Sequence, residues 1–513
     1  MSLHRRPLEG PPSRLPPAVD AVILGGGPAG AAAARLLADW GHRVVVVTRP
    51  ARQPLAESLP PSASKLLDRI GMTAAVDRAG FIRATGNTVW WGTTAPRMES
   101  FGGSALGWQV RRDELDRLML EEAGRAGAVI VDRATVLDAA PLQGVDGTSL
   151  VRYDRDGNEE SISAQWVLDC TGRTGLVARR GWRRADPAGR TLALVGIWER
   201  HAWDMLVDAT HTLVESYDGG WAWSVPVSAQ RRYVTVMVDP ALTAVRSPDG
   251  APGLTALYEA ELAKAVELDA LARSGREPAR LIGAPFARDA SSYSATRFAD
   301  ERMLLVGDAA SFIDPLSSYG IKKALSSAWL ASVVVHTALD DENLRSPALE
   351  LYERRERAMY DGLRRRFAEL SRDAAETGAT TFWRARGAAE AGEDGEPDVD
   401  ALRRDSDVLA AFDAMRSRPS VTLRAAPAVQ RVERPMVRGD RITMGEHLVA
   451  PAFREGVRYI RSVDLVAIMS LAPAHDQVPD LYAAYNRAAA PVPLPDFLGA
   501  LSVLVGKGLL DLA

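Results

Sequence analysis

A glycine-rich turn near the start of the chain has the spacing of a phosphate-binding loop. Gly25, Gly27 and Gly30 form G-x-G-x-x-G, after an apolar run at 21–24 and before a helix-forming stretch at 31–40. In such a turn the first glycine permits the tight bend, the second lets a pyrophosphate approach, and the third lets helix and strand pack closely. The free N–H groups at the helix start then face the phosphate. The pattern predicts a dinucleotide site, without distinguishing NAD from FAD.

Further positions that could bind a cofactor favour FAD. The carboxylate of Asp308, in a Gly-Asp pair that ends a predicted strand, could accept hydrogen bonds from ribityl hydroxyls, which nicotinamide cofactors lack. Asp314 and Pro315 lead into a predicted helix whose N-terminus can stabilise negative charge on a reduced flavin ring. Arg112, at another helix start, could hold the diphosphate or the ribityl chain. Thr48 stands where an acid would bind the adenosine ribose, and its hydroxyl is a weaker acceptor than a carboxylate.

The elements that must position these residues alternate between strand and helix. Apolar runs at 21–24, 44–47, 164–170 and 302–306 are typical of buried parallel strands, and helical patterns cover 111–128 and 317–339. Between 192 and 239, β-branched and aromatic residues alternate in part, which indicates an antiparallel sheet. After about 341 the pattern is helical, with an acidic stretch at 390–400 interpreted as a linker or exposed loop.

We therefore predict an α/β fold: a Rossmann-like FAD-binding domain interrupted by an antiparallel β-sheet substrate domain, plus a mainly helical C-terminal region. The expected bounds are a flexible tail at 1–18, the FAD-binding domain at 19–88, 107–190 and 285–340, the substrate domain at 89–106 and 191–284, and the C-terminal domain at 341–513.

Composition excludes several other functions. The 513 residues include 47% hydrophobic and 25% charged residues, as in ordinary globular proteins. The net charge of -4 provides no cationic field for nucleic acid. Cys170 is the one cysteine, so an internal disulfide and a four-cysteine zinc site are impossible, and a reducing cytoplasm is the expected compartment. The apolar stretch 325–339 is too short and polar to span a membrane. We expect no metal site.

Four segments together resemble FAD-dependent monooxygenases: GGGPAG at 25–30, WQVRRDELDRLML at 108–120, DCTGRTG at 169–175 and GDAASFIDPLSSYGIKKAL at 307–325. The segment GWAWSVP at 220–226 narrows the resemblance to the tryptophan halogenase branch, whose pattern is G-W-x-W-x-I-P. The implied fold is of the glutathione-reductase/hydroxylase type. The residues implied to bind FAD are Gly25, Gly27, Pro28, Ala29, Gly30, Thr48, Arg49, Ser58, Arg112, Gly307, Asp308, Pro315, Ser318, Gly320 and Ile321. Trp221, Trp223 and Pro226 are the expected substrate-pocket residues.

The sequence departs from halogenases at the positions that handle halogen. Halogenases carry a lysine in a K-x-G-E-S loop, and Pro54 stands at that position here. Tryptophan halogenases also place a glutamate after D-P-L, where this chain has Ser317. Arg52 and Lys65 are nearby cations, but nothing in their spacing supports a substitute role. We therefore rank oxygenation above halogenation.

A subset of the branch is similar over a short segment. Flavoproteins that hydroxylate a protein-bound tryptophan during tryptophylquinone biogenesis resemble the pattern D-P-[LI]-S-S-x-G-[IV]-x-K-A-L, present here at 314–325. Lys322 and Lys323 of this segment are expected to face solvent on the helix. The resemblance suggests a tryptophan in a peptide or protein as one form of the substrate.

The resemblance implies that reduced FAD reacts with O2 to give a C4a-hydroperoxide, whose distal oxygen hydroxylates an indole- or phenol-like ring. Glu57 and Asp314 are the candidate catalytic residues. The segment at 169–173 departs from the D-G-x-x-S-x-x-R element that helps to bind NAD(P)H, which favours electrons from NAD(P)H through a separate flavin reductase. Two alternatives stay open: an aromatic halogenase with a rearranged site, and a catalytically idle flavin-binding partner protein.

Overall fold

The computed structural model describes residues 18–49, 55–92, 95–102, 105–141, 147–187, 189–203, 208–243, 253–275, 277–317, 319–377, 381–388, 402 and 404–512. The chain divides into two compact units, residues 1–391 and 392–513, and each is described by itself. The predicted N-terminal tail, apart from Ala18, and the predicted acidic linker lie outside the described residues.

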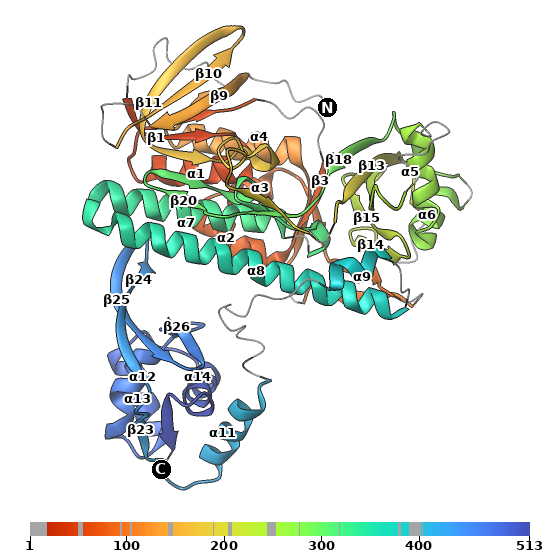
Figure 1. Cartoon of the computed structure of the whole chain (residues 1–513). Helices are drawn as coiled ribbons and strands as arrows, with labels where there is room; N and C mark the ends of the chain where they lie inside the picture. Colours follow the sequence, from red (N-terminus) through yellow and green to blue (C-terminus); the bar gives the residue numbers. More distant parts are fainter. Residues whose placement is uncertain are drawn as a thin grey trace. The chain divides into compact units, whose positions relative to one another are not determined.

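The first unit contains a mixed sheet, of which β1, β9, β10 and β11 are labelled in Figure 1. Its strands run in the order β20 (Ala299–Asp300), β21 (Met303–Leu305), β11 (Asn158–Asp169), β1 (Ala18–Leu24), β2 (Val44–Val47) and β8 (Val129–Val131), with β10 (Ser149–Arg155) and β9 (Ala134–Pro141) extending from β11. The strands from β21 to β8 are parallel, as the buried apolar runs predict. Leu24, Asp169 and Leu305 are paired, so the loops after β1, β11 and β21 meet at one edge.

Helices cover this sheet and fix the loops at its edge. They are α1 (Pro28–Asp39), α2 (Ser64–Ile70), α3 (Thr73–Arg78), α4 (Arg112–Arg125), α7 (Gly320–Asp340) and α8 (Arg345–Thr377). Helix α1 packs against both α4 and α7, and α7 packs against α8. The predicted apolar stripe of α7 is buried, including Ile321, Leu325 and Val334, which confirms this helix. The helix predicted at 31–40 is α1, which ends before Gly41 at φ 88°.

A second, largely antiparallel sheet confirms the prediction for 192–239. Its strands are ordered β17 (Arg280–Leu281), β13 (Leu192–Glu199), β16 (Arg231–Val238), β15 (Gly220–Pro226), β14 (Thr212–Tyr217), β5 (Gly86–Trp90) and β6 (Arg97–Ser100), with β18 (Phe286–Asp289) also on β13. Helices α5 (Leu254–Leu262) and α6 (Val266–Arg273) cover one face (Figure 1). Helix α9 (Thr381–Gly387) packs on the other face, which also contacts the β22–Leu316 segment.

Small elements connect the two sheets. Strands β3 (Ala56–Leu59) and β4 (Ile82–Ala84) pair with β7 (Gly107–Arg111), which leads directly into α4. Strands β12 (Arg183–Ala185) and β22 (Ser311–Phe312) pair with β19 (Tyr293–Ala295). A 3-10 turn at Pro315–Ser317 precedes α7.

The second unit contains the helices that the sequence predicts, together with strands that it does not. The helices are α11 (Ser406–Arg416), α12 (Leu465–Leu471), α13 (Val478–Ala488) and α14 (Leu494–Gly506); the strands include β23 (Leu423–Ala425), β24 (Gln430–Arg438), β25 (Arg441–Ala450), β26 (Phe453–Val457) and β29 (Leu510–Leu512). Strand β24 is mostly exposed and rich in arginine, so it lacks the apolar alternation that marks a strand. The expected C-terminal domain began near 341, whereas α8 and α9 belong to the first unit.

No described helix is long and apolar enough to cross a membrane. Among the same residues, no cluster of three or more His, Cys, Asp or Glu side chains could hold a metal ion.

Candidate functional site

The glycine turn after β1 is shaped by close backbone packing at two of its three glycines. A Cβ on Gly30 would lie 1.9 Å from the Gly25 carbonyl oxygen, and a Cβ on Gly25 would lie 2.5 Å from the Cys170 carbonyl oxygen. Gly25 also has φ 103°, a conformation that side chains disfavour. A Cβ on Gly27 would meet nothing closer than 3.8 Å, so the space over this backbone is open.

Helix α1 presents its N-terminus at this open space. Pro28 is the first helical residue, and Gly27 at the N-cap offers no side chain to accept the free N–H groups. Those groups and the positive end of the helix dipole suit an anionic phosphate. Ala29 is buried behind the turn, at 7% exposure.

Thr48 and Arg49 follow β2 at the same edge of the sheet. Thr48 is buried, and its hydroxyl accepts a hydrogen bond from the Gly26 N–H at 3.0 Å, so it braces the glycine turn. A hydroxyl oxygen has a second lone pair, and binding of the ribose by Thr48 stays a prediction. Arg49 is exposed.

Arg112 links the glycine turn to strand β3. Its guanidinium donates to Glu57 Oε1 and, at 3.0 Å and 3.3 Å, to the two carboxylate oxygens of Asp116. An ideal Cβ on Gly27 would lie 3.8 Å from Arg112 Nη2, and one on Gly320 would lie 3.5 Å from Glu57 Oε2. The predicted residues Gly27, Arg112, Glu57 and Gly320 are therefore brought together.

The pKa values of Glu57 and Arg112 differ from those of free side chains. Burial raises the pKa of Glu57, and the positive charge of Arg112 opposes the shift. The pKa of Arg112 is raised despite burial, because two carboxylates contact it, so the guanidinium stays charged. About a quarter of each side chain, 26% for Arg112 and 27% for Glu57, is exposed. Ser58, the next residue of β3, is buried and by strand alternation lies on the opposite face from Glu57.

The Gly307–Asp308 turn after β21 lies against the same helix α1. Gly307 has φ 62°, and a Cβ there would lie 3.3 Å from the Ala29 Cβ. The Asp308 carboxylate is near Glu57, because its charge contributes to the raised pKa of Glu57. The buried ammonium of Lys323 forms an ion pair with Asp308 Oδ1 at 3.2 Å.

The prediction that Lys323 faces solvent was wrong. Its side chain is 4% exposed, because the first turns of α7 pack directly under the Gly307–Ser311 turn. Its neighbour Lys322 is half-buried and donates to the Tyr319 hydroxyl at 2.7 Å. The sequence does contain one indication that Lys323 is buried. It lies four residues before Ser327, so the two share a helix face at the edge of the apolar stripe.

Asp314 is the more deeply buried of the two predicted catalytic residues, Glu57 and Asp314. Its Oδ1 accepts the Leu316 N–H at 3.2 Å, whereas Oδ2 has no hydrogen-bond partner among the described residues. Burial raises the pKa of Asp314 to about 7, and the positive charge of Arg386 opposes this shift. The Trp221 indole N–H is close enough to lower this pKa but does not complete a hydrogen bond.

Trp221 and Trp223 form the aromatic wall beside Asp314. Their rings stack with centroids 4.7 Å apart and planes 25° apart, and they share the face of β15 that packs against Phe312 and Leu316. Pro226 was expected on this wall, but the regular alternation of β15 places it on the opposite face, which Ala222 shares. Of the other predicted residues, Pro315 opens the 3-10 turn, Ile321 is buried in α7, and Ser318 lies outside the described residues.

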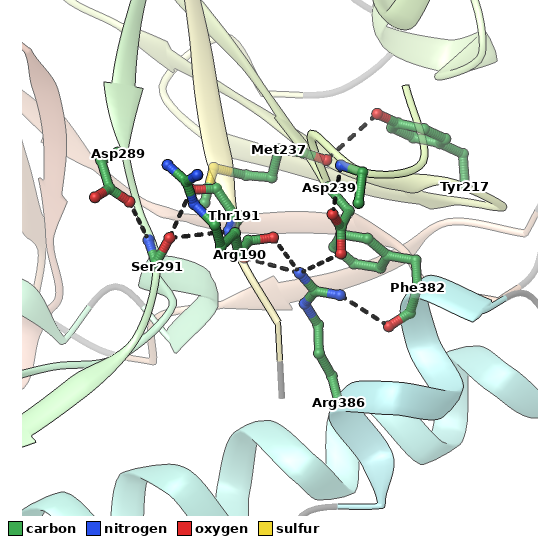
Figure 2. A network of polar contacts seen from close by, with 10 residues as sticks. Arg190, Thr191, Tyr217, Met237, Asp239, Asp289, Ser291, Phe382 and Arg386 are labelled. Atoms are coloured by element: carbon green, nitrogen blue, oxygen red, sulfur yellow. Dashed lines mark hydrogen bonds and ion pairs between the residues drawn. The ribbon is translucent and has the colours of Figure 1, made fainter. Parts of the chain in front are cut away.

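Helix α9 supplies a residue that the sequence analysis missed. Arg386 is buried, and its Nη2 donates to the Arg190 carbonyl at 2.8 Å and to Thr191 Oγ1 at 3.0 Å, and pairs with Asp239 at 3.5 Å (Figure 2). A second nitrogen, Nη1, donates to the Phe382 carbonyl at 3.1 Å (Figure 2). Arg386 thus joins α9 to the ends of β13 and β16.

Arg386 and the segment that carries Asp314 line the same small cavity. It has a volume of about 20 Å³, and both Arg386 and Ile313 line it. On the aromatic side, Trp383 of α9 donates its indole N–H to the Tyr217 carbonyl at 2.9 Å and packs edge-on against Trp91. Nothing in the sequence signals this role of α9, because, apart from the Phe382 carbonyl, the hydrogen-bond partners of Arg386 and Trp383 lie over 140 residues earlier in the chain.

Comparisons with known proteins identify the family of the chain. Residues 18–359 match the family model described as FAD binding domain, and the chain belongs to that family. It is an FAD-dependent oxidoreductase of the halogenase and monooxygenase type. The chain is 29% identical over 396 residues to the tryptophan 2-halogenase of Chondromyces crocatus, covering 73% of this chain and 71% of that protein.

Two solved structures share the fold over nearly the whole chain. The flavin-dependent halogenase CmlS superposes with a TM-score of 0.78 at 23% identity, covering 96% of each chain. The peptidyl tryptophan dihydroxylase QhpG superposes with a TM-score of 0.68 at 22% identity, covering 96% of this chain and all of that one. These likenesses confirm the predicted fold class.

The residues at the sheet edge fit FAD. The open backbone at Gly27 and the uncapped start of α1 suit the diphosphate, and Arg112 adds a fixed positive charge next to it. Asp308 offers a carboxylate to hydroxyl donors, as a ribityl chain requires. The α7 N-terminus, beside Glu57, provides the positive dipole end that suits an electron-rich ring.

Proposed function

We propose that this protein is an FAD-dependent monooxygenase that hydroxylates an electron-rich aromatic ring of the indole or phenol class. The observation that carries the proposal is the replacement of the halogenase lysine by Pro54, which has no amine to hold halogen. The chain contains only five lysines in all. Lys65 is exposed on α2, and Lys264 pairs with Glu261 at 2.7 Å. Lys322 donates to the Tyr319 hydroxyl at 2.7 Å, and Lys323 is enclosed by protein oxygens. Lys507, in the second unit, pairs with Asp405.

The aromatic wall suits a planar ring. Stacking on Trp221 and Trp223 would hold the ring by its face, and the packing around them would exclude water. Bound FAD would supply activated oxygen from O2 to the electron-rich carbon. The protein must then remove one proton from the substituted ring, and Asp314 Oδ2 is a buried acceptor for it. A carboxyl with a pKa of about 7 changes protonation near neutral pH, as a general base requires.

Two features of the proposal concern its partners. We infer that NAD(P)H delivers electrons through a separate flavin reductase, because the 169–173 segment lacks the element that assists NAD(P)H binding. Asp169 instead accepts the Thr171 and Val177 N–H groups at 3.0 Å and 2.8 Å, a structural role in its own turn. The fold shared with a peptidyl tryptophan dihydroxylase supports a tryptophan in a peptide as one substrate form, beside free small molecules.

The test is product mass with and without halide. FAD-loaded protein, a flavin reductase and NADH would be incubated with tryptophan-containing peptides and simple phenols, with and without bromide. We expect addition of one oxygen atom in both conditions, and no product when the protein is omitted. Fast NADH consumption by the purified protein without reductase would contradict the two-component proposal.

Halogenation is the second candidate, because the matched relatives include a tryptophan 2-halogenase and further flavin-dependent halogenases. In this case the bromide reaction would give exchange of one ring hydrogen for bromine, and no oxygenated product would form without halide. The same experiment therefore separates the two candidates.

A further inference from the structure

Four buried polar side chains form a ladder between α7 and α8, beneath the Gly307–Ser311 turn. Lys323 and Ser327 lie one helical turn apart on α7, and Tyr352 and Glu356 lie one turn apart on α8. All four are at most 4% exposed. Burial of four polar groups between two helices costs free energy unless their contacts compensate.

Three of the four bind the end of β21 and the turn after it. Ser327 Oγ accepts the Gly307 N–H at 2.9 Å, and the Tyr352 hydroxyl donates to the Leu305 carbonyl at 2.7 Å. The Lys323 ammonium donates to the Gly307 carbonyl at 3.0 Å and to the Ser311 carbonyl. The ladder therefore fixes both ends of the turn that carries Asp308.

The fourth member, Glu356, is a carboxyl with no evident task of its own. Neither of its oxygens has a hydrogen-bond partner among the described residues. Burial raises the pKa of Glu356 to about 7, and the positive charge of Lys323 is the largest opposing influence. Lys323 thus interacts with two carboxyls. Asp308 lies 3.2 Å away, toward the cofactor edge, and Glu356 belongs to α8, which packs against α7.

We propose that Lys323 is a positioning residue for the flavin, which holds the Asp308 carboxylate and its turn in the orientation that binds the cofactor. Asp308 is 30% exposed, and its charge acts on Glu57, which Arg112 contacts. Without Lys323 the carboxylate loses its ion pair, and the turn loses two carbonyl contacts. Glu356 is the second carboxyl whose charge interacts with that of Lys323. The inference rests on the FAD site and not on the substrate or the oxygen chemistry proposed above.

The test measures FAD affinity directly, by fluorescence titration of apo-protein. The variant K323M keeps the length of the side chain and removes its charge, and we expect it to weaken FAD binding by about 10- to 100-fold, as for loss of charged hydrogen bonds. The matched control K322M alters the adjacent, half-exposed lysine and should change FAD affinity by less than about twofold. Wild-type FAD affinity in K323M would overturn the proposal.

A double-mutant cycle distinguishes positioning of Asp308 from a general loss of stability. If Lys323 acts through Asp308, then K323M adds less than about threefold to the loss of FAD affinity already caused by D308N. Fully additive losses would contradict this route.

The double variant K323M/E356Q removes both buried charged groups. It keeps the test informative if K323M alone is too unstable to fold. We expect it to regain the urea stability that K323M loses, because no unpaired carboxylate remains, while FAD affinity stays reduced. Recovery of FAD affinity together with stability would show that Lys323 is merely structural and would overturn the proposal.

Discussion

The cofactor edge and the aromatic wall of the first unit are built by different means. At the cofactor edge, shape comes from the backbone: Gly25 and Gly30 leave no room for a Cβ, and short loops follow three paired strands. At the aromatic wall, shape comes from side chains of distant segments, such as Trp221, Asp314 and Arg386. The first is a local pattern on a fixed sheet, whereas the second exists only after the chain has folded.

The two regions also differ in the partners that they give to their buried ionisable groups. Arg112 at the cofactor edge contacts two carboxylates and keeps its charge. At the aromatic wall, Asp314 has an oxygen without a partner among the described residues, and its pKa is raised to about 7 by burial. Fixed charges suit the binding of a permanent phosphate, whereas a carboxyl poised near neutrality suits proton transfer.

The largest effect is expected for the variant G30A. The added Cβ would lie 1.9 Å from the Gly25 carbonyl oxygen, which is backbone and cannot rotate away, so α1 must separate from β1. We expect loss of FAD binding and a fall in the free energy of unfolding of about 3 kcal/mol, measured by urea titration. The control G27A meets nothing within 3.8 Å. It should keep its stability within about 0.5 kcal/mol and lose only FAD affinity, because the methyl group occupies the phosphate approach. Equal destabilisation by both variants would contradict the distinction.

The second effect concerns Asp314. The variant D314N should lower the turnover rate by about 100-fold or more with FAD affinity unchanged, since general-base catalysis contributes 10²–10⁴-fold. In the wild type the rate should rise with pH through about 7, as the carboxyl loses its proton, and this limb should vanish in D314N. An unchanged pH profile in D314N would exclude Asp314 as the base.

Stability gives an independent measurement of the same group. Because burial raises the pKa of Asp314 above its ordinary 3.8, the folded state binds the proton more tightly than the unfolded state. Wild-type stability should therefore fall as pH rises from about 4 to about 7, and D314N should lack this contribution. Urea titrations at several pH values should show the two curves diverging between about pH 4 and pH 7 and running parallel above it; curves that stay parallel from pH 4 to 7 would contradict the raised pKa.

Sequence patterns predicted the cofactor edge because its determinants are local. Gly25 to Gly30, the Gly307–Asp308 pair and the stripe on α7 are each readable in one short segment, and parallel strands bring their carboxyl ends together. The two kinds of sheet were also predictable. Continuous apolar runs indicated the buried parallel strands, and the partial alternation between 192 and 239 indicated the antiparallel sheet.

The aromatic wall was only half predictable. Trp221 and Trp223 were found from their motif, and Pro226 was misplaced because a motif does not state which face each residue occupies. Arg386 and Trp383 were missed, since most of their hydrogen-bond partners, such as the backbone carbonyls at 190 and 217, lie far from them in the sequence. Lys323 was misplaced because a lysine is usually exposed, and only its neighbours in space compensate for burying it.

A smaller effect is expected for E57Q, which tests whether Glu57 belongs with the cofactor edge. Glutamine keeps the shape but removes one of the two negative partners of Arg112, while Asp116 still holds the guanidinium at 3.0 Å. We expect FAD affinity to fall by about three- to tenfold, with little further loss of turnover at saturating FAD. A large loss of turnover with normal FAD affinity would instead assign Glu57 to the chemistry.

The smallest effect isolates one N–H group of the aromatic wall. The variant W221F keeps an aromatic ring and removes the indole N–H that lowers the pKa of Asp314. That pKa should rise, so the rising limb of the pH–rate profile should move to higher pH by less than about one unit, with lower activity at pH 7 that recovers at higher pH. The matched control W223F removes an indole from the stacked neighbour, 4.7 Å away, and should leave the limb in place. A shift of equal size in both variants would mean that the whole wall, rather than the Trp221 N–H, sets the proton affinity of Asp314.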